Sequence, residues 1–299
     1  MKQDEIAEEA GVHRTSVSRE LKRNKTADGY NPLQAEGLAQ KRQKEKGRRR
    51  IEEWIWKEVE EKLREHWSPE QISGRRQAEG QYPVSHEWIY QHVYEDKRAG
   101  GDLHTYLRCR KKRRKRYGSY RKRGFTGHPM SIDERTSIVD ERARIGDMEA
   151  DTIIGKGRQQ AIVTIVDRKS KLLRMKKVRN KTALLVAETI CNEMKGLTIH
   201  TLTSDNGREF AGYGYIERRL GIDYYFCHPY SSWERGVNEN TNGLIRQFFP
   251  KGMRFETITD EQIKQIELKL NNRPRKSLAF QTPNEVYLSE HRQLTRGAL

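Results

Sequence analysis

Apolar residues recur at helical spacing at the start of the chain, and polar residues fill the positions between them. Two short apolar faces in residues 4–24 are formed by Ile6, Ala7, Ala10, Val12, Val17 and Leu21. Gly11 stands between these faces, where a tight turn needs a residue that accepts a positive φ. Two short helices joined in this way predict a helix-turn-helix unit, which we place in residues 1–48.

The polar face of the second helix in this unit carries small hydroxyl and basic side chains, which are Arg14, Thr15, Ser18, Arg19 and Arg23. Such side chains suit base edges and phosphates in a major groove, so they are candidate DNA contacts. A solvated amphipathic helix is the alternative. Few residues precede the unit, and a helix-turn-helix usually has a further helix there, so we expect a unit that is shortened or that begins upstream.

A second helical domain is predicted for residues 49–107. Residues 51–67 carry apolar side chains at steps of three and four, the pattern of an amphipathic helix. Ser68 and Gln71 then have the spacing of a capping box, with a proline at the first helical position. A third helix begins at Ser85. Three helices of this length predict a helix-turn-helix-like domain whose last helix is the candidate reader of DNA.

The second half of the chain alternates between strand and helix patterns. Strands are predicted for residues 148–155, 161–170, 172–178, 198–207 and 223–230, and helices for residues 181–196, 207–222 and 231–249. Three strands followed by alternating helices and strands predict a mixed sheet with helices on both faces. We therefore expect a multidomain protein in which all-α DNA-binding units precede an α/β domain. That domain is placed in residues 141–299 and ends in a helical tail, and residues 108–140 form a basic linker.

Three acidic residues of the α/β domain stand where a site could form. Asp151 lies within the first strand, and Asp205 ends the fourth, at the kind of strand terminus where α/β sheets carry their chemistry. The third acid should come from the following helix, which holds Glu234 and Glu239. Glu234 follows Ser231 by three residues, and that spacing predicts a capping box that would explain it. Glu239 has no such capping role, so we favour it as the third acid.

Two aspartates and one glutamate offer oxygen ligands without nitrogen or sulfur. Hard oxygen ligands favour Mg²⁺ or Mn²⁺ over zinc. Three carboxylates can hold two ions about 4 Å apart, one generating the attacking hydroxyl and the other stabilising the leaving oxygen of a phosphodiester. The alternative is a chance grouping, because any chain of this length has three acids that can be arranged so on paper.

The charge of the chain narrows the choice of partner. Of 299 residues, 59 are Lys or Arg and 42 are Asp or Glu, which gives a formal net charge of +17. This excess favours nucleic acid, with an anionic membrane surface as the alternative. From Arg108 to Arg123, 11 of 16 residues are basic, among them the candidate DNA contacts Lys111, Lys112, Arg113 and Arg114. Such a block is either a solvated linker or a segment that lies along a phosphate backbone.

Other features limit the environment of the protein. No apolar run approaches the roughly 20 residues that span a bilayer, and no secretory signal opens the chain. Cys109, Cys191 and Cys227 are far apart and form no CxxC pair, which predicts ordinary thiols and neither a disulfide framework nor a zinc knuckle. We expect a soluble intracellular protein.

Five segments carry a resemblance to a known family, and they occur in the order RIGDMEADTIIG, IVDRKS, TSDNGREF, FCHPYSSWERGVNENTNGLIRQFFPKG and LNNRPRKSLAFQTPNEVY. The chain resembles the DDE transposases of the insertion-sequence-thirty family over nearly its whole length. The resemblance implies a ribonuclease H-like catalytic domain, related to retroviral integrases, with Asp151, Asp205 and Glu239 as its triad. The 33 residues between Asp205 and Glu239 fit the family pattern. Met148 departs from it, because the family usually has tryptophan there.

The resemblance also implies a mechanism, partners and a location, which is the bacterial cytoplasm in association with the nucleoid. The N-terminal units would bind the terminal inverted repeats of a bacterial insertion sequence. Two metal ions at the triad would activate water to free a 3′-hydroxyl, which would then attack a strand of target DNA. Asn206 and Asn240 would support the acids, and the joining of two ends implies a dimer or a higher oligomer on DNA.

Two arginines flank the predicted catalytic glutamate. Arg235 lies one turn before Glu239 and Arg246 lies two turns after it, so both would face about the same side of a helix. We expect both to contact DNA phosphate.

Three other classes of protein stay open. A sequence-specific DNA-binding repressor with an inactive ribonuclease H-like domain fits the charge and the helical units, although it leaves the three acids unexplained. A ribonuclease H-like nuclease that cuts without strand transfer does not explain two DNA-reading units. A membrane-surface protein has only the net charge in its favour, because no apolar face lies opposite the basic block.

Overall fold

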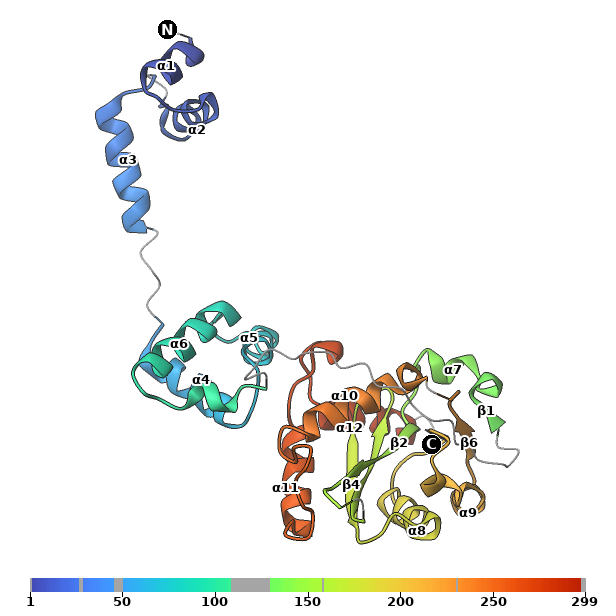
Figure 1. Cartoon of the computed structure of the whole chain (residues 1–299). Helices are drawn as coiled ribbons and strands as arrows, with labels where there is room; N and C mark the ends of the chain where they lie inside the picture. The colour runs from blue at the N-terminus through green and yellow to red at the C-terminus, as the bar shows by residue number, and fades with distance from the viewer. Residues whose placement is uncertain are drawn as a thin grey trace. The chain divides into compact units, whose positions relative to one another are not determined.

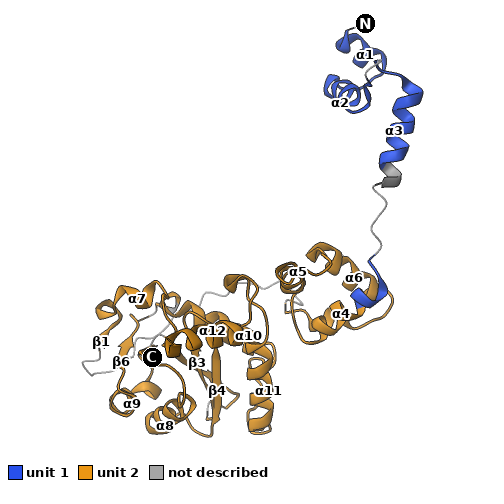
Figure 2. Ribbon diagram, turned by 180° about the vertical axis from the view of Figure 1, so that it is seen from behind, with its two compact units in different colours: residues 1–56 blue, residues 57–299 orange. Residues whose placement is uncertain are grey.

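The computed structural model describes residues 2–26, 29–45, 51–108, 130–157, 159–229 and 231–296. Cys109 and the four basic candidates Lys111, Lys112, Arg113 and Arg114 lie outside these ranges, so their expected roles stay predictions. The chain forms two compact units, residues 1–56 and 57–299, and the division falls within α4 (Glu53–Arg64) (Figure 2).

The first unit contains three helices, which are α1 (Gln3–Glu9), α2 (Arg14–Asn24) and α3 (Pro32–Glu45). The turn between α1 and α2 passes through Gly11, whose φ of +62° is the left-handed value that the sequence predicted. Ala7, Val17 and Ala35 are buried, one from each helix, so α3 adds apolar contact to the core of the first two helices. All five candidate DNA contacts on α2 are exposed.

The second unit begins with a helical part that follows the predicted pattern. Its elements after α4 are α5 (Pro69–Ala78), α6 (His86–Arg98) and η1 (Leu103–Tyr106). The capping box at the start of α5 is confirmed, because Gln71 N donates to Ser68 Oγ at 3.3 Å and Ser68 N donates to Gln71 Oε1 at 2.9 Å. Its core consists of the buried side chains Val59, Leu63, Ile72, Ile89, Val93 and Leu103.

A mixed six-stranded sheet organises the rest of the second unit, as predicted (Figure 1). Its strands are β1 (Met130–Ser131), β2 (Asp147–Ile154), β3 (Ala161–Asp167), β4 (Leu173–Val178), β5 (Thr201–Ser204) and β6 (Asp223–Phe226). They lie in the order β1-β6-β5-β2-β3-β4. Strands β2, β3 and β4 pair in antiparallel fashion, whereas β2 with β5, β5 with β6 and β6 with β1 are parallel.

Helices cover both faces of this sheet, so the predicted layering is confirmed. The α-helices are α7 (Ser137–Asp140), α8 (Ala183–Glu193), α9 (Tyr213–Leu220), α10 (Gly236–Ile245), α11 (Asp260–Asn271) and α12 (Pro283–Arg296). Short 3₁₀ turns are η2 (Ile132–Glu134), η3 (Arg208–Phe210), η4 (Ser232–Arg235) and η5 (Lys276–Leu278). On β3, Val163 and Ile165 pack in one apolar core with α8 and α9, and Ile162 and Val166 pack in another with α10 and α11. Two covered faces explain why β3 is an unbroken apolar run.

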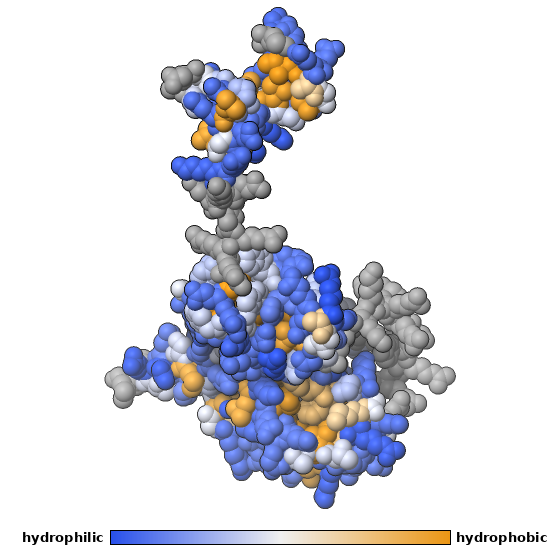
Figure 3. All heavy atoms as spheres, turned by 90° about the vertical axis from the view of Figure 1, so that its left-hand side faces the viewer, coloured by the Kyte–Doolittle hydropathy of each residue, from blue (hydrophilic) through white to orange (hydrophobic). Residues whose placement is uncertain are grey.

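The surface is mostly polar, in keeping with a mean hydropathy of −1.01. Figure 3 shows one face, on which hydrophilic residues surround smaller hydrophobic patches. Among the described residues, no helix is both long enough and apolar enough to cross a membrane.

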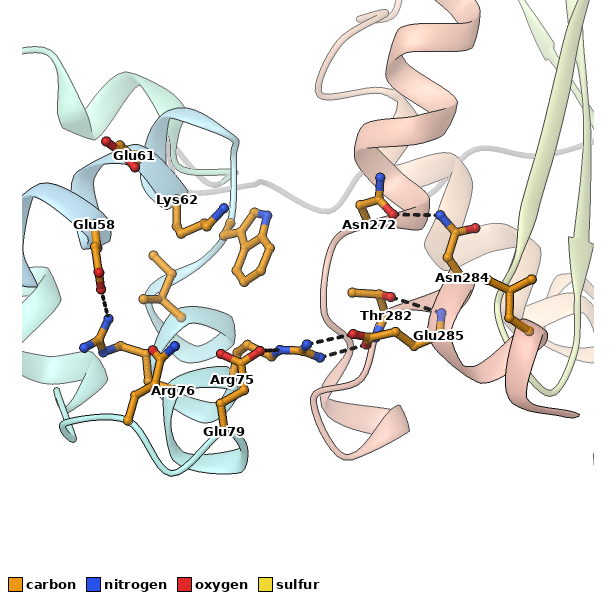
Figure 4. A pocket seen from close by; sticks show the side chains of 14 residues that line it. Glu58, Glu61, Lys62, Arg75, Arg76, Glu79, Asn272, Thr282, Asn284 and Glu285 are labelled. Atoms are coloured by element: carbon orange, nitrogen blue, oxygen red, sulfur yellow. Dashed lines mark hydrogen bonds and ion pairs between the residues drawn. The ribbon is translucent and has the colours of Figure 1, made fainter.

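The helical part of the second unit is joined to its C-terminal segment by polar and apolar contacts. Arg75 on α5 makes two 2.7 Å bonds to the carboxylate of Glu285 on α12 (Figure 4). This guanidinium lowers the pKa of Glu285 to about 2. Gln71 donates to the carbonyl of Pro274 at 2.7 Å. Gly74 lies against the ring of Phe280, so closely that an added Cβ would stand 2.3 Å from ring carbons.

Gly74→Ala is therefore expected to destabilise the protein by about 1 kcal/mol or more, because overpacking outweighs the helix propensity gained by alanine. The measurement is the free energy of unfolding in urea. In a Phe280→Ala background the ring is absent, and the same Gly74→Ala change should become neutral or stabilising. A Gly74→Ala effect of equal size in both backgrounds would contradict the contact.

Candidate active site

The structure brings Asp151 and Asp205 together at one end of the parallel strands. Glu149 of β2 pairs with Thr203 of β5, and each aspartate lies two residues beyond this pair. The Arg235 guanidinium joins them, with Nη1 3.3 Å from Asp151 Oδ2 and Nη2 3.1 Å from Asp205 Oδ2. The predicted convergence of these two acids is thus present in the fold.

Backbone and amide groups fix both carboxylates. Asp151 accepts hydrogen bonds from Thr152 N and from Asn242 Nδ2, both at 2.8 Å. Asp205 Oδ1 accepts from Gly207 N at 3.0 Å. The Asp151 side chain is 24% exposed and the Asp205 side chain is 45% exposed, so both can be reached from solvent.

The surroundings of Asp151 raise the pKa of its carboxyl above the usual value, chiefly through burial. Arg235 opposes this rise, whereas the charges of Asp205 and Glu209 add to it. A cation bound between the two aspartates would stabilise the charged form, because opposite charge favours ionisation.

Glu209 of η3 is a fourth acid near this site, and it was not predicted from the sequence. It accepts a hydrogen bond from Thr152 Oγ1 at 3.0 Å. Lys181 Nζ lies 3.9 Å from the same carboxylate. Its position in TSDNGREF, four residues after Asp205, is the signal in the sequence that places it near this strand end.

Asparagines of α10 attach this helix to the sheet. Asn238 is fully buried, with its backbone N donating to Glu149 Oε2 at 2.9 Å and its side chain donating to Glu149 O at 3.1 Å. Thr164 Oγ1 lies 3.2 Å from the side-chain oxygens of both Asn238 and Asn242. These contacts explain a helix rich in asparagine. The contacts of these two asparagines with the sheet were not predicted from the sequence, although their spacing of four puts them on one helix face.

The expected capping box at Ser231 is wrong. Its side chain makes no capping bond, and α10 begins at Gly236 after the separate turn η4. The Glu234 carboxylate accepts from His228 N at 2.9 Å and lies 2.8 Å from the His228 ring. Glu234 therefore has a local structural role after all, but a different one.

Glu239 is exposed on α10, three residues before Asn242. Residues three apart lie on neighbouring positions of a helix surface, so Glu239 is on about the same side as the group that holds Asp151. In the described part of the chain, no three His, Cys, Asp or Glu side chains come close enough to hold a metal ion. The triad of Asp151, Asp205 and Glu239 as a metal site therefore stays a prediction.

The two arginines near Glu239 lie differently from the expectation of phosphate contacts. Arg235 is 7% exposed and is engaged by both aspartates. Arg246 donates to the carbonyls of Phe249 at 3.3 Å and Ile154 at 3.1 Å, which ties the end of α10 to the end of β2. Both guanidinium groups thus make ion pairs or hydrogen bonds with other groups of the protein.

The two expected supporting asparagines have different positions. Asn206 donates to the carbonyl of Cys227 at 2.7 Å and so fixes the loop after Asp205. Asn240 is exposed and lines a separate cavity behind α10. Cys191 and Cys227 are buried free thiols, as predicted. Burial raises the pKa of Cys227 to about 12.

His228 connects two acidic side chains beside the site. Its ring nitrogens lie 2.8 Å from Glu234 and 2.9 Å from Asp133, and these partners raise the pKa of His228. Trp233, in η4 next to Glu234, is 73% exposed. The loop before α10 is therefore held on one side by His228 while its tryptophan faces solvent.

The raised pKa of His228 predicts a pH-dependent contribution to stability. The charged imidazole is favoured in the folded state, so the contribution is complete below the unfolded value of about 6.5 and is lost as pH rises through the folded value. His228→Gln should lower the melting temperature most in mildly acidic buffer and least in alkaline buffer. His86→Gln, at an exposed site on α6, is the control, and a constant difference across pH would contradict the assignment.

Three known proteins align along most of the chain. The transposase for insertion sequence element IS4351 of Bacteroides fragilis is 47% identical, and the alignment covers 96% of this chain and 90% of that protein. The transposase for insertion sequence element IS1086 of Cupriavidus metallidurans is 34% identical, with coverage of 94% and 87%. Transposase InsI for insertion sequence element IS30A of Escherichia coli is 34% identical, with coverage of 91% and 75%.

Among solved structures, the catalytic core domain of BIV integrase aligns with 50% of this chain and 97% of that chain, at 25% identity and a TM-score of 0.40. No protein-family model matches the chain.

Proposed function

Because the chain belongs to the insertion-sequence-thirty family of transposases, we propose that it cuts and joins DNA strands at a site formed by Asp151, Asp205 and Glu239. The convergence of the two aspartates on one cation, the Arg235 guanidinium, carries this proposal. Two carboxylates that are held this close together can also bind a metal ion, which would share them with the guanidinium. The ribonuclease H-like character of the domain is part of the same proposal, and the order of its mixed sheet supports it.

The carboxylate oxygens of these side chains are the kind of ligand that suits a divalent metal ion. Asp151 and Asp205 are accessible to solvent, and Glu239 is exposed near Asn242. The three carboxylates would hold Mg²⁺ or Mn²⁺, for which hard oxygen ligands are suited. Two such ions would supply positive charge at the phosphodiester and promote ionisation of the attacking water.

Groups of the protein itself hold these carboxylates in position. Asn242 orients the Asp151 carboxylate, and Gly207 N orients that of Asp205. Arg235 partly neutralises both, so the two negative charges can stay close before any metal ion enters. Preset orientation of this kind lowers the entropic cost of assembling a reactive complex.

DNA recognition is assigned to the N-terminal helices. The exposed polar face of α2 offers Arg14, Thr15, Ser18, Arg19 and Arg23 to the terminal inverted repeats. The net charge of +17 favours contact with both these repeats and target DNA. Because two DNA ends must be joined, we propose a dimer or a higher oligomer on DNA.

An excision assay tests this function. A plasmid carrying the DNA that flanks the gene on both sides is incubated with the protein and Mg²⁺, and products are mapped by sequencing across the expected junction. We expect cut ends and joined ends, both abolished by a chelator. Tight binding of the flanking DNA without any cleavage would contradict the proposal and favour the repressor.

A further inference from the structure

A cavity of 170 Å³ lies beside α10, and several basic side chains line it. One wall is formed by α10 residues Gly236, Val237, Asn240 and Thr241, and the other by Arg142, Lys171, Arg275 and Ser277. Asn238 and Asn242, which attach α10 to the sheet beside Asp151, do not belong to this wall. The cavity is therefore separate from the pair of aspartates.

The cavity carries positive charge that its own walls do not balance. Among the described residues that line it, none has a carboxylate. The hydrogen bonds of its two more buried cations go to neutral groups, with Lys171 Nζ donating to Arg168 O and Arg275 Nη2 donating to Leu270 O at 2.8 Å. Neutral carbonyls satisfy the hydrogen bonds of a buried cation but contribute no opposite charge.

Two acids, Glu149 and Asp167, attract the charge of Lys171, but each also serves other groups of the protein. Glu149 accepts from Asn238 N, and its carboxylate lies 3.6 Å from Arg168. Asp167 accepts from Gly146 N at 2.7 Å and from the Ser170 backbone and hydroxyl, both at 2.6 Å. Both acids are buried on the sheet side, so neither reaches the cavity as a lining group.

The titration of these cations reflects the same imbalance. Burial, followed by repulsion from Arg142, lowers the pKa of Lys171 to about 8, although the carboxylates of Glu149 and Asp167 oppose this shift. Burial, followed by repulsion from Arg273 and Arg108, lowers the pKa of Arg275 to about 9. An anion between the walls would reverse the repulsion, because opposite charge stabilises the protonated forms.

The backbone at two of these cations is held in an uncommon conformation. Arg142 has φ +56° and Lys171 has φ +64°, although both are non-glycine residues. The left-handed region is unfavourable for such residues, and strained positions of this kind cluster at binding sites. Glycine would fit these turns more easily, which makes a cationic residue at both positions an uncommon choice.

We propose that this cavity binds one backbone phosphate of a DNA strand. A phosphodiester brings the missing negative charge, and Arg142 is exposed, so the group can enter from solvent. Asn240 and Ser277 add polar side chains that can donate to phosphate oxygens. The assignment to DNA rests on the proposed function, and it places a strand beside α10, adjacent in sequence to Glu239.

The test uses the full chain and the variant Lys171→Asn, because asparagine tolerates a positive φ and removes the charge. Lys195→Asn, at an exposed site after α8, is the matched control. Binding to a mixed-sequence DNA duplex is measured by fluorescence anisotropy over a range of salt concentrations. We expect the slope of log K against log salt to become shallower by about 0.9 in Lys171→Asn, the value for one lost phosphate contact, and to stay unchanged in the control.

A second measurement separates DNA phosphate from a free anion. Melting temperatures are recorded in inorganic phosphate and in chloride at equal ionic strength. We expect phosphate to stabilise the wild type and the control, and to give no such gain in Lys171→Asn. Stabilisation by phosphate with an unchanged salt slope would overturn the DNA assignment in favour of a free anion. No effect on either quantity would overturn the site itself.

Neither measurement requires cleavage, so failure of this site and failure of the proposed activity are distinguishable. A protein that cuts and joins DNA, but shows neither the change in salt slope nor the stabilisation by phosphate, would refute only the proposed phosphate site in the cavity. A variant that folds poorly would be recognised by a lower melting temperature in chloride, and Arg142→Asn then provides an independent removal of charge from the same cavity. If Arg142→Asn also leaves the salt slope unchanged, the proposal is overturned.

Discussion

Asp151→Asn should abolish strand cleavage and joining while leaving DNA binding intact. The change removes one negative charge from the pair that would hold the metal ions, and it leaves the volume of the side chain almost unchanged. Loss of about 4 kcal/mol of transition-state stabilisation corresponds to a rate lower by about 10³-fold. The measurement is the rate of cleavage of a labelled duplex that carries the element's end, with Mg²⁺ present.

The control for this prediction is Asp223→Asn, which changes an exposed acid at the start of β6. It should keep the wild-type cleavage rate. Anisotropy with the same duplex should give equal affinity for wild type and both variants, because the helices that we propose to bind DNA are unchanged. An Asp151→Asn protein that cleaves at more than about a tenth of the wild-type rate would be incompatible with a metal ligand at this position.

The second large effect is expected for Arg235→Met in the absence of divalent metal. Removing one partner of a buried ion pair leaves the other charge uncompensated and costs about 3–5 kcal/mol. Because the Asp205 side chain is 45% exposed, we expect a loss of about 2–3 kcal/mol in the free energy of unfolding. Unfolding in urea, in buffer with a chelator, gives this quantity.

Mg²⁺ should then stabilise Arg235→Met more than it stabilises the wild type. In the variant a metal ion meets two carboxylates that have lost their internal cation, so it binds the folded state more tightly. Arg246→Met is the control, because Arg246 donates to carbonyls and not to these acids. Equal stabilisation of all three proteins by Mg²⁺ would show that Arg235 and the metal ion do not share a site.

The strands could be predicted from the sequence because their apolar, β-branched runs are long and bounded by turns. The buried run of β3 and the alternation of β4 were sufficient for this purpose. β1, by contrast, has only two residues, too few for any periodicity, and it exists because Met130 and Ser131 pair with β6. A strand so short depends on its partner and leaves no local pattern.

The candidate site was predicted in part, and the remainder depended on tertiary contacts. Ser231 and Glu234 have the spacing of a capping box, but the Glu234 carboxylate binds His228 instead, so a contact in the fold outweighed the local pattern. The helical spacing of Arg235 from Glu239 predicted a DNA contact, but Arg235 pairs with Asp151 and Asp205, which lie in β2 and directly after β5. Contacts between residues that are far apart in the sequence leave no local pattern from which they could be predicted.

The roles of the asparagines in α10 also depended on tertiary contacts. Their number indicated that the helix does more than pack, which is correct. Which of them face the sheet depends on how α10 packs against β2 and β3, and the spacing of the asparagines does not determine this packing. Asn238 and Asn242 hold the sheet, whereas Asn240, which was expected to support an acid, lines the basic cavity.

The most direct test of the account compares Glu239→Gln with Glu234→Gln in the excision assay. Both changes remove one negative charge from the same short segment, and only Glu239 is assigned to the metal site. We predict that Glu239→Gln gives no cut or joined ends, whereas Glu234→Gln, which loses a contact to His228, still gives both. Cleavage by Glu239→Gln, or its loss only in Glu234→Gln, would contradict the proposed triad.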